Sequence, residues 1–282
     1  MILGRSAYVI RMGALIGAVM ASGCSIRTIA VRTTADLVSR GIPAFYEESD
    51  PQLGAESMPG QLKLLEVLLR SDPNNPLLLA ALTEAYAGYA FLFIEDKNPD
   101  RAAHLYKRAA DYGLRLLKPK KEFDIWLDQT GQGDVAGLYW TASALAGWAN
   151  LDLSNPDALA KIPMAEKMMT RVLVLDASFQ YGGADTFFGV LNSARPVIAG
   201  GNPKKGQEHF RRALSYSNGK FLPTKLLYMK YYAVTVMDED LFRKLHDEIV
   251  NADPNELKEM RLANEVAKLK AKRLMEQIDD LL

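Results

Sequence analysis

The residue with the clearest reactive chemistry is the single cysteine, Cys24. Residues 21–24 read Ala-Ser-Gly-Cys and end an apolar run that Arg5 and Arg11 precede. This run is too short to span a bilayer, and it has the form of a secretory signal. Small residues before a cysteine resemble the lipobox of bacterial lipoproteins, in which the cysteine sulfur is acylated. The sequence therefore predicts lipid attachment at Cys24 and a cleaved signal peptide over residues 1–23; the alternative is an ordinary signal with an incidental cysteine.

Acylation ties the rest of such a chain to a membrane. Acyl chains contribute about 0.8 kcal/mol per buried CH₂, so two or more chains on one residue give a stable anchor. Cys24 has no second cysteine to pair with, and Ser25 follows it in place of the aspartate that favours retention at the inner membrane. We therefore expect a lipid-anchored protein of the bacterial cell envelope that faces the periplasm, with the outer membrane favoured. Residues 24–39 are expected to form a lipidated lead and residues 40–282 the folded domain.

Aromatic side chains at helical spacing are the next candidates for function. Many of them recur three or four residues apart, so several share one face of a predicted helix. Such a stripe has two interpretations: it is buried in the core, or it lines an apolar pocket or channel. The candidate pocket residues are Tyr86, Tyr89, Phe93, Tyr139, Trp140, Trp148 and Phe187.

Motifs for catalysis or cofactor binding are incomplete. Residues 131–136 fit a dinucleotide fingerprint, but no buried strand precedes them, so we interpret them as a loop before a helix. Residues 201–206 have the glycine spacing of a phosphate loop without its Lys and Ser/Thr. The three histidines stand far apart, and none has a second His or Cys at metal-ligand spacing. We expect no enzymatic activity, no cofactor and no metal; an enzyme whose site is scattered in the sequence is the remaining alternative.

The charge balance argues against nucleic acid as a partner. The chain has 34 basic and 34 acidic residues, and loss of Arg5 and Arg11 with the signal peptide leaves a formal charge of −2. No basic surplus remains to neutralise phosphates. After the signal we see no second apolar stretch of membrane-spanning length, so we expect the folded domain to be soluble and tethered only at its first residue.

The elements that position these residues are predicted to be helices. Apolar residues recur at spacings of three and four, and no period-2 run is long enough to indicate a sheet. Each break pairs Asn or Asp with Pro, which suits an N-cap followed by proline in the first helical turn. The breaks fall at residues 72–76, 98–100, 155–157, 200–203 and 253–255.

Some of these helices match the second helix of a tetratricopeptide unit, in which small, large and small residues alternate along one face. The matches are 102–109 and 206–213, with looser ones at 165–172 and 60–67. Their first residues are 42, 63 and 41 positions apart, unlike the regular period of about 34 residues. The sequence therefore predicts an all-α fold of degenerate tetratricopeptide-like helical hairpins, stacked as a solenoid with a concave face.

The last segment, 254–282, is predicted to be one long helix. Apolar residues and Asn264 recur at seven-residue intervals along it, which forms a heptad seam with one polar position. Two interpretations remain open. The helix caps the solenoid and is buried by it, or it contributes to an interface between subunits.

Nine short segments, taken together in their order and spacing, are similar to one known family. They are 48–51 (ESDP), 62–66 (LKLLE), 89–91 (YAF), 105–109 (LYKRA), 112–114 (YGL), 138–140 (LYW), 200–203 (GGNP), 209–214 (HFRRAL) and 261–264 (RLAN). Over most of the chain after the signal, the sequence resembles the TatT family of lipoproteins, which are associated with tripartite ATP-independent periplasmic (TRAP) transporters.

The resemblance implies several properties. It implies an all-helical protomer with degenerate tetratricopeptide units, a homotrimer, and an apolar channel through each protomer. It also implies association with the periplasmic solute-binding protein of the transporter and no enzymatic activity.

The leading hypothesis is an accessory lipoprotein that binds such a solute-binding protein and holds a small apolar organic ligand in an internal channel. The alternative is a helical-repeat scaffold lipoprotein for envelope assembly that has protein partners only.

Overall fold

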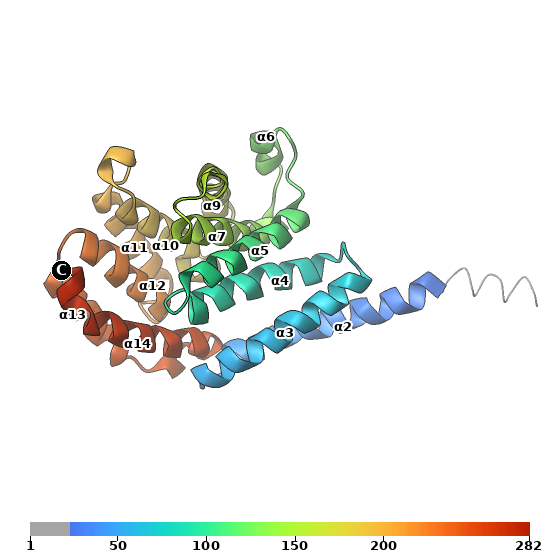
Figure 1. The fold of residues 1–282 in the computed structure, drawn as a ribbon, viewed down its shortest axis with the longest axis horizontal. Coiled ribbons are helices and arrows are strands. Elements are labelled where there is room, and N and C mark those ends of the chain that lie inside the picture. The colour runs from blue at the N-terminus through green and yellow to red at the C-terminus, as the bar shows by residue number, and fades with distance from the viewer. Residues whose placement is uncertain (1–22) are drawn as a thin grey trace, which may run out of the picture.

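The computed structural model describes the backbone of residues 23–282 and the side chains of residues 29–282. The predicted signal residues 1–22 lie outside the described residues, as does the side chain of Cys24. Within the described part every regular element is a helix, so the all-α prediction is confirmed (Figure 1). The α-helices are α2 (Gly23–Tyr46), α3 (Pro51–Ser71), α4 (Pro76–Tyr89), α5 (Pro99–Leu117), α6 (Phe123–Asp128), α7 (Val135–Leu151), α8 (Pro156–Leu159), α9 (Ile162–Asp176), α10 (Phe179–Ala194), α11 (Pro203–Tyr216), α12 (Leu222–Leu227), α13 (Glu239–Val250), α14 (Arg261–Glu276) and α15 (Ile278–Leu281).

Five shorter elements have other helical geometries. Two π-helices, η1 (Ala90–Ile94) and η4 (Tyr228–Ala233), continue α4 and α12 without a break. Three 3₁₀ turns are η2 (Gln132–Asp134), η3 (Val197–Ala199) and η5 (Pro254–Met260). A π-helix inserts an extra residue into the turn, and this geometry often occurs at functional sites.

The helix starts follow the predicted breaks. Asn75, Asn98, Asn155, Asn202 and Asp253 each accept a hydrogen bond from a backbone N–H of the next helical turn, and a proline stands in each of those turns. These side chains satisfy donors that have no partner inside the helix, while proline lacks the N–H that would need one. The Asn/Asp-Pro pattern therefore identifies helix starts correctly.

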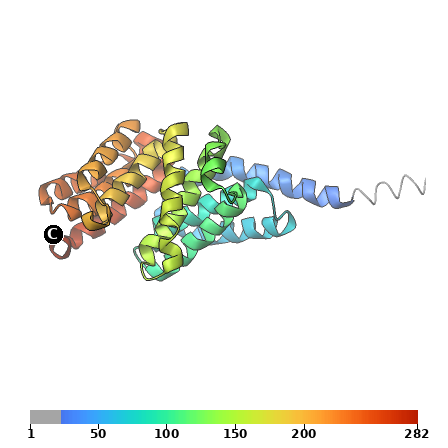
Figure 2. The same ribbon diagram turned by 90° about the horizontal axis from the view of Figure 1, so that it is seen from above.

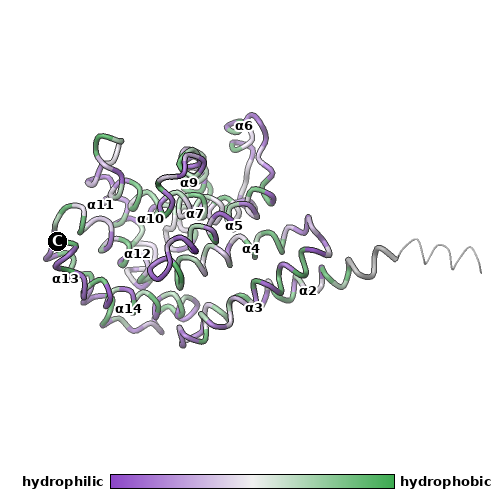
Figure 3. The backbone as a smooth tube through the Cα atoms, viewed as in Figure 1, coloured by the Kyte–Doolittle hydropathy of each residue, from purple (hydrophilic) through white to green (hydrophobic). Residues whose placement is uncertain are grey.

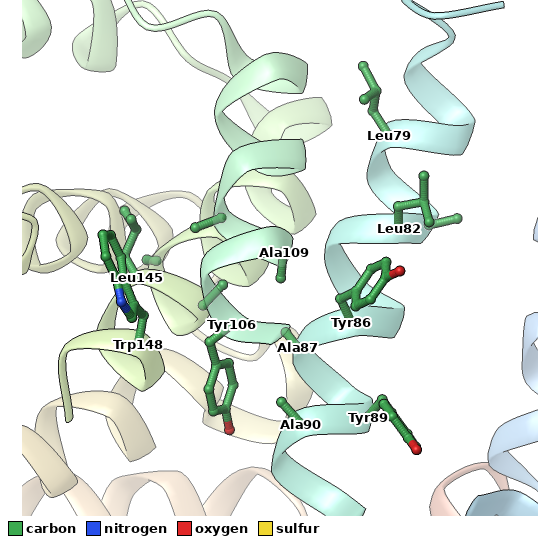
Figure 4. Packing of buried hydrophobic residues seen from close by; sticks show 14 of the residues in the cluster. Leu79, Leu82, Tyr86, Ala87, Tyr89, Ala90, Tyr106, Ala109, Leu145 and Trp148 are labelled. Carbon is green, nitrogen blue, oxygen red and sulfur yellow. The ribbon is translucent and has the colours of Figure 1, made fainter. Parts of the chain in front are cut away.

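Neighbouring helices pack as antiparallel pairs. Close approach of α5 and α7 requires glycines: a Cβ at Gly147 would lie 2.8 Å from the ring of Tyr106, and one at Gly113 would collide with Thr141. The order of these contacts runs in opposite directions along the two helices. Figure 4 shows Tyr106 between the helix that carries Ala87 and the helix that carries Trp148. The same small-against-aromatic contact recurs between α10 and α11.

The predicted repeat positions are mostly packing positions. The residues at the small, large and small positions of 102–109, 165–172 and 206–213 are all buried. The loose match at 60–67 is wrong as a packing face, because Leu64 and Val67 are 52% and 65% exposed. The helix α3 instead buries the stripe that contains Met58, Leu62, Leu65 and Leu69. Hydrophobic and hydrophilic stretches alternate along α3 and α14, as expected for helices with one buried face (Figure 3).

The helix α4 and its continuation η1 together form one apolar segment. The segment Pro76–Ile94 is apolar and long enough to cross a membrane, contrary to our expectation that no such stretch follows the signal. However, 67% of its apolar window is buried inside the protein. It packs against α3, α5 and α7, which is the position of a core helix.

The C-terminal segment is not the single long helix that we predicted. It begins with η5, and Leu257 has an extended φ of −135° that separates the first turn from the rest. Asn264 on α14 is 1% exposed, and it bonds to two backbone groups of the same chain: its Oδ1 accepts from the N–H of Leu222 at 2.9 Å, and its Nδ2 donates to the carbonyl of Lys220 at 3.0 Å. The polar heptad position therefore holds the start of α12 in place inside the protomer.

The same helix connects the two ends of the chain. Arg261 donates to the carbonyl of Glu47 at 2.8 Å, and Lys270 donates to the carbonyl of Phe91 in η1. The row of helices thus curves until α14 meets α2, α3 and η1. The helix α2, which includes the whole of the predicted lead, buries Val31 and Ala35 and extends beyond the body of the molecule (Figure 2).

Candidate functional site

A cavity of about 640 Å³ lies between four helical segments. These are α4 with η1, α7, α10, and α12 with η4, which contribute most of the wall. Single residues of α5, α8 and α9, the last residue of α2 and the start of α14 complete it. Its volume is in the range that holds a drug-sized organic molecule.

Three of the seven predicted pocket residues line this cavity: Tyr139, Trp140 and Phe187. The rings of Tyr139 and Trp140 meet edge to face with centroids 5.0 Å apart, and Phe179 packs against Tyr139 at 5.3 Å. Edge-to-face contacts of this kind fix the ring orientations and stabilise the wall beyond simple burial. The structure thus brings aromatic residues of α7 and α10 together around one space.

The other four predicted residues lie elsewhere in the core. Tyr86 donates to Glu66 at 2.6 Å, and Tyr89 packs against Phe93 at 6.0 Å. Trp148 has Lys107 over its ring at 5.5 Å. Among these four, Phe93 lines a second, smaller cavity of about 420 Å³, which shares Leu92 with the main one.

Several other residues that line the cavity are not among the seven predicted ones. On α7 they continue from Trp140 at spacings of three and four, and on α4 with η1 they include Gly88, Phe91 and Glu95. The signal that identifies them is the continuous stripe with small residues, Ser143, Gly147 and Asn150, that follows Trp140 on one face. Small side chains on that face leave room where large ones would fill it.

Gly88 shows this most clearly. It faces the cavity from α4, and a Cβ placed on it would meet no atom within 4 Å. A glycine inside a helix costs about 0.5–1 kcal/mol relative to alanine. The backbone does not need glycine here, since Gly88 lies in an ordinary α-helix. The empty space in front of it belongs to the cavity.

The wall at α10 begins with a left-handed turn. Gln180, Tyr181 and Gly182 have φ angles of 49°, 55° and 78°, and Gln180 lines the cavity. Left-handed backbone costs a non-glycine residue about 1–2 kcal/mol. Such strain persists only where the surrounding structure holds it, and it often occurs at functional sites. The turn places Gly183 against the ring of Tyr139, where a Cβ would come within 2.5 Å.

One end of the cavity, which we call the aromatic end, contains Tyr46 and Tyr139. Tyr46 donates a short hydrogen bond to Glu84. Burial raises the pKa of Glu84, although the bond from Tyr46 opposes this shift. Burial also raises the pKa of Tyr139 to about 12, partly offset by a hydrogen bond with Ser143. Both tyrosines are therefore neutral hydrogen-bonding groups at neutral pH.

The other end, which we call the charged end, lies beside the two π-helices. Glu95 accepts from the Tyr106 hydroxyl at 2.8 Å, and Asn150 donates to the Tyr231 hydroxyl at 3.3 Å. All four side chains line the cavity. Burial raises the pKa of Tyr231, and the negative charge of Glu95 raises it further, so the two hydrogen-bonded pairs lie close together.

Two lysines hold the acidic groups of this end. Lys270, only 7% exposed, lies 2.8 Å from Asp96 and 3.5 Å from Glu95. Lys230 lies 3.2 Å from Asp96 and 3.8 Å from Glu95. Burial alone would raise the pKa of Asp96, but Lys270 and then Lys230 outweigh it and lower that pKa. The same acids, together with Tyr231, raise the pKa of Lys230 against the effect of burial.

The arrangement is suited to binding. Apolar side chains form most of the wall, and the only charged residues in it are Glu95 and Arg195, both ion-paired within the protein. In the part of the chain that the structure describes, no group of three His, Cys, Asp or Glu side chains is placed to hold a metal ion.

Comparison with known proteins agrees with the resemblance. An uncharacterised protein of Treponema pallidum (strain Nichols) is 23% identical over 266 residues, which cover 84% of this chain and 81% of that protein. The profile of the TAtT family, described as the TRAP transporter T-component, matches residues 47–282. This match begins directly after α2 and covers every other helix that lines the cavity, and the chain therefore belongs to the TRAP transporter T-component family.

Proposed function

We propose that this protein is a non-enzymatic accessory lipoprotein that binds a periplasmic solute-binding protein and holds a small apolar organic ligand in the cavity between α4, α7 and α10. The single observation that carries the ligand-binding part is the 640 Å³ cavity walled by Tyr139, Trp140 and Phe187. Protein interiors are close-packed, so an apolar space of this size between helices favours a ligand site.

Membership of the T-component family gives the coarser frame. It indicates an accessory role in TRAP transport, association with that transporter, and a place in the bacterial cell envelope. Within this frame we propose lipid attachment at Cys24, an anchor in the outer membrane and a homotrimer. We also propose that the antiparallel helix pairs are degenerate tetratricopeptide-like units of a solenoid whose inner face forms the cavity.

Filling the cavity from Gly88 tests the ligand-binding part. In Gly88→Leu the new side chain enters open space, so the protein should fold while the cavity loses volume. We expect binding of the neutral dye N-phenyl-1-naphthylamine, followed by fluorescence, to weaken at least tenfold. Gly60→Leu is the matched control: it is also a helical glycine with no atom within 4 Å of its Cβ, but it lies on the exposed face of α3. Equal dye binding by wild type and Gly88→Leu would contradict the proposal.

The partner part needs its own experiment. In-cell crosslinking of the tagged, lipidated protein, followed by pull-down and mass spectrometry, should recover a periplasmic solute-binding protein. Recovery of envelope-assembly proteins without any solute-binding protein would favour the scaffold alternative.

A further inference from the structure

We propose that the cavity selects a neutral amphiphile, with its apolar body along Trp140 and Phe187 and one uncharged hydroxyl head between Asn150 and Tyr231 at the charged end. This inference rests on the proposed ligand-binding function and names the chemical class of the ligand.

The cavity opens at the charged end. Leu153 and Leu159, which line it just after Asn150 in sequence, are 69% and 43% exposed. At the aromatic end, Tyr46 and Tyr139 are closed in by their contacts with Glu84 and Phe179. A ligand that enters from solvent therefore passes its apolar part toward the aromatic end and leaves its polar head near Asn150.

Hydrogen-bonding capacity remains at Asn150 and Tyr231. The Tyr231 hydroxyl accepts from Asn150 Nδ2, which leaves the hydroxyl proton for another acceptor. The amide oxygen of Asn150 is an acceptor that this bond does not use. A ligand hydroxyl both accepts and donates, so one such group matches a free donor on Tyr231 and a free acceptor on Asn150.

Most of the other polar groups of the wall are already bonded to one another, both at the charged end and farther along the wall. Glu95 accepts from Tyr106, and the hydroxyls of Thr186 and Thr224 lie 3.2 Å apart. Gln180 adds an amide, but it stands at the aromatic end, away from the opening. The Asn150–Tyr231 pair is thus the polar group that a head near the opening meets.

The charges around that pair exclude a charged head. Glu95 and Asp96 are balanced by Lys230 and Lys270, and Arg195 is paired with Glu166. A carboxylate placed here would lie beside Glu95 without a cation of its own, and an ammonium would add a third positive charge to the two lysines. A charged head would lose part of its hydration there and gain no counter-ion in return, which is unfavourable. A neutral head adds no such cost.

Three probes with the same chain separate these cases: 1-octanol, octanoate and octylamine. Each is used at pH 7 to displace N-phenyl-1-naphthylamine from the wild-type protein. We expect 1-octanol to displace the dye at a concentration at least tenfold lower than either charged probe. Equal potency, or better displacement by octanoate or octylamine, would overturn the inference.

Tyr231→Phe removes the proposed donor and keeps the ring. A typical net hydrogen bond corresponds to a change of about two- to tenfold in affinity, so 1-octanol should bind that much more weakly while the dye itself binds as before. Tyr232→Phe is the matched control, because it is the adjacent residue of η4 and does not line the cavity. Loss of octanol affinity in both variants, or in neither, would contradict the assigned position of the head.

The outcomes distinguish the two proposals. If the wild-type protein binds neither the dye nor any probe, the ligand-binding function itself fails. If the dye binds and Gly88→Leu blocks it, but the three heads compete equally, only the neutral-head inference fails.

Discussion

The two ends of the cavity share the helix α7 but are stabilised by different physical means. At the aromatic end, neutral tyrosines and the strained turn of α10 enclose the space, and burial dominates the titration of Glu84. At the charged end, two acids and two lysines compensate one another beside the π-helices. The helix α7 contributes to both, with Tyr139 and Asn150. One continuous wall therefore carries an end stabilised by packing and an end stabilised by charge pairing.

The largest expected change in stability comes from the loss of a buried charge at the charged end. Lys270→Met leaves Glu95 and Asp96 without their most buried partner, and breaking a buried ion pair typically costs about 3–5 kcal/mol. We expect a decrease of that size in the free energy of unfolding, measured by urea denaturation. Lys272→Met, an exposed lysine on the same helix, should change stability by less than about 0.5 kcal/mol. Similar losses in both variants would show that the ion pairs do not hold this end.

Gly182→Ala, which affects the backbone of the aromatic end, should destabilise the protein less than Lys270→Met does. Gly182→Ala introduces a Cβ 2.8 Å from the backbone of Ala213 and 2.5 Å from the ring of Tyr216, at a φ of 78°. Overpacking and the left-handed conformation together should cost about 2–4 kcal/mol in urea unfolding.

A substitution two residues earlier, at Gln180, should increase the free energy of unfolding instead of decreasing it. Gln180→Gly relieves a left-handed non-glycine residue, so we expect a gain of about 0.5–1 kcal/mol after the entropy of glycine is included. Destabilisation by Gln180→Gly would mean that the amide of Gln180, rather than the backbone, matters at this position.

The pH dependence of stability should differ in sign between the two ends. We expect these changes in stability to be smaller than those caused by the substitutions above. The pKa of Glu84 is raised by burial, so the folded protein binds its proton more tightly and the contribution of Glu84 to stability falls as pH rises through that raised pKa. The pKa of Asp96 is lowered by Lys270 and Lys230 despite burial. Its contribution is therefore complete above the ordinary aspartate pKa and is lost as pH falls through the lowered one.

Two variants separate these contributions. Glu84→Gln should flatten the decline in urea stability toward neutral pH, and Asp96→Asn should flatten the decline toward acid pH. Identical pH profiles for the two variants would contradict the difference between the ends.

Helices and their starts could be predicted from the sequence, because each depends on local chemistry. The Asn/Asp-Pro pairs cap helices, and residues 131–134 form a short turn before α7, in which Gly131 N–H donates to Asp134 at 2.9 Å. The packed faces of α5, α9 and α11 also follow from the pattern of small and large residues. Helix geometry and capping need only neighbours in sequence.

The cavity could be predicted only in part, because an apolar stripe does not reveal whether it faces another helix or an open space. Trp140 and Trp148 lie eight residues apart on α7, which corresponds to a rotation of about 80° away from alignment, so they do not share one face of the helix. In the structure Trp140 lines the cavity, while Trp148 packs beneath Lys107 of α5. The left-handed conformation of Gln180 runs against the local preference of a non-glycine residue, so the local sequence does not predict it.

The contact between α14 and the first helices has a consequence for the order in which the protein forms. Antiparallel neighbours such as α4 and α5 can pair as soon as both are synthesised, whereas the bonds from Arg261 to Glu47 and from Lys270 to Phe91 span 214 and 179 residues. A nascent chain that ends before Arg261 leaves uncovered the apolar surface on which Leu262 packs near Gly54 and Phe93. The wall of the cavity, which includes Met260 and Ala263, is thus completed only after the start of α14 has been synthesised.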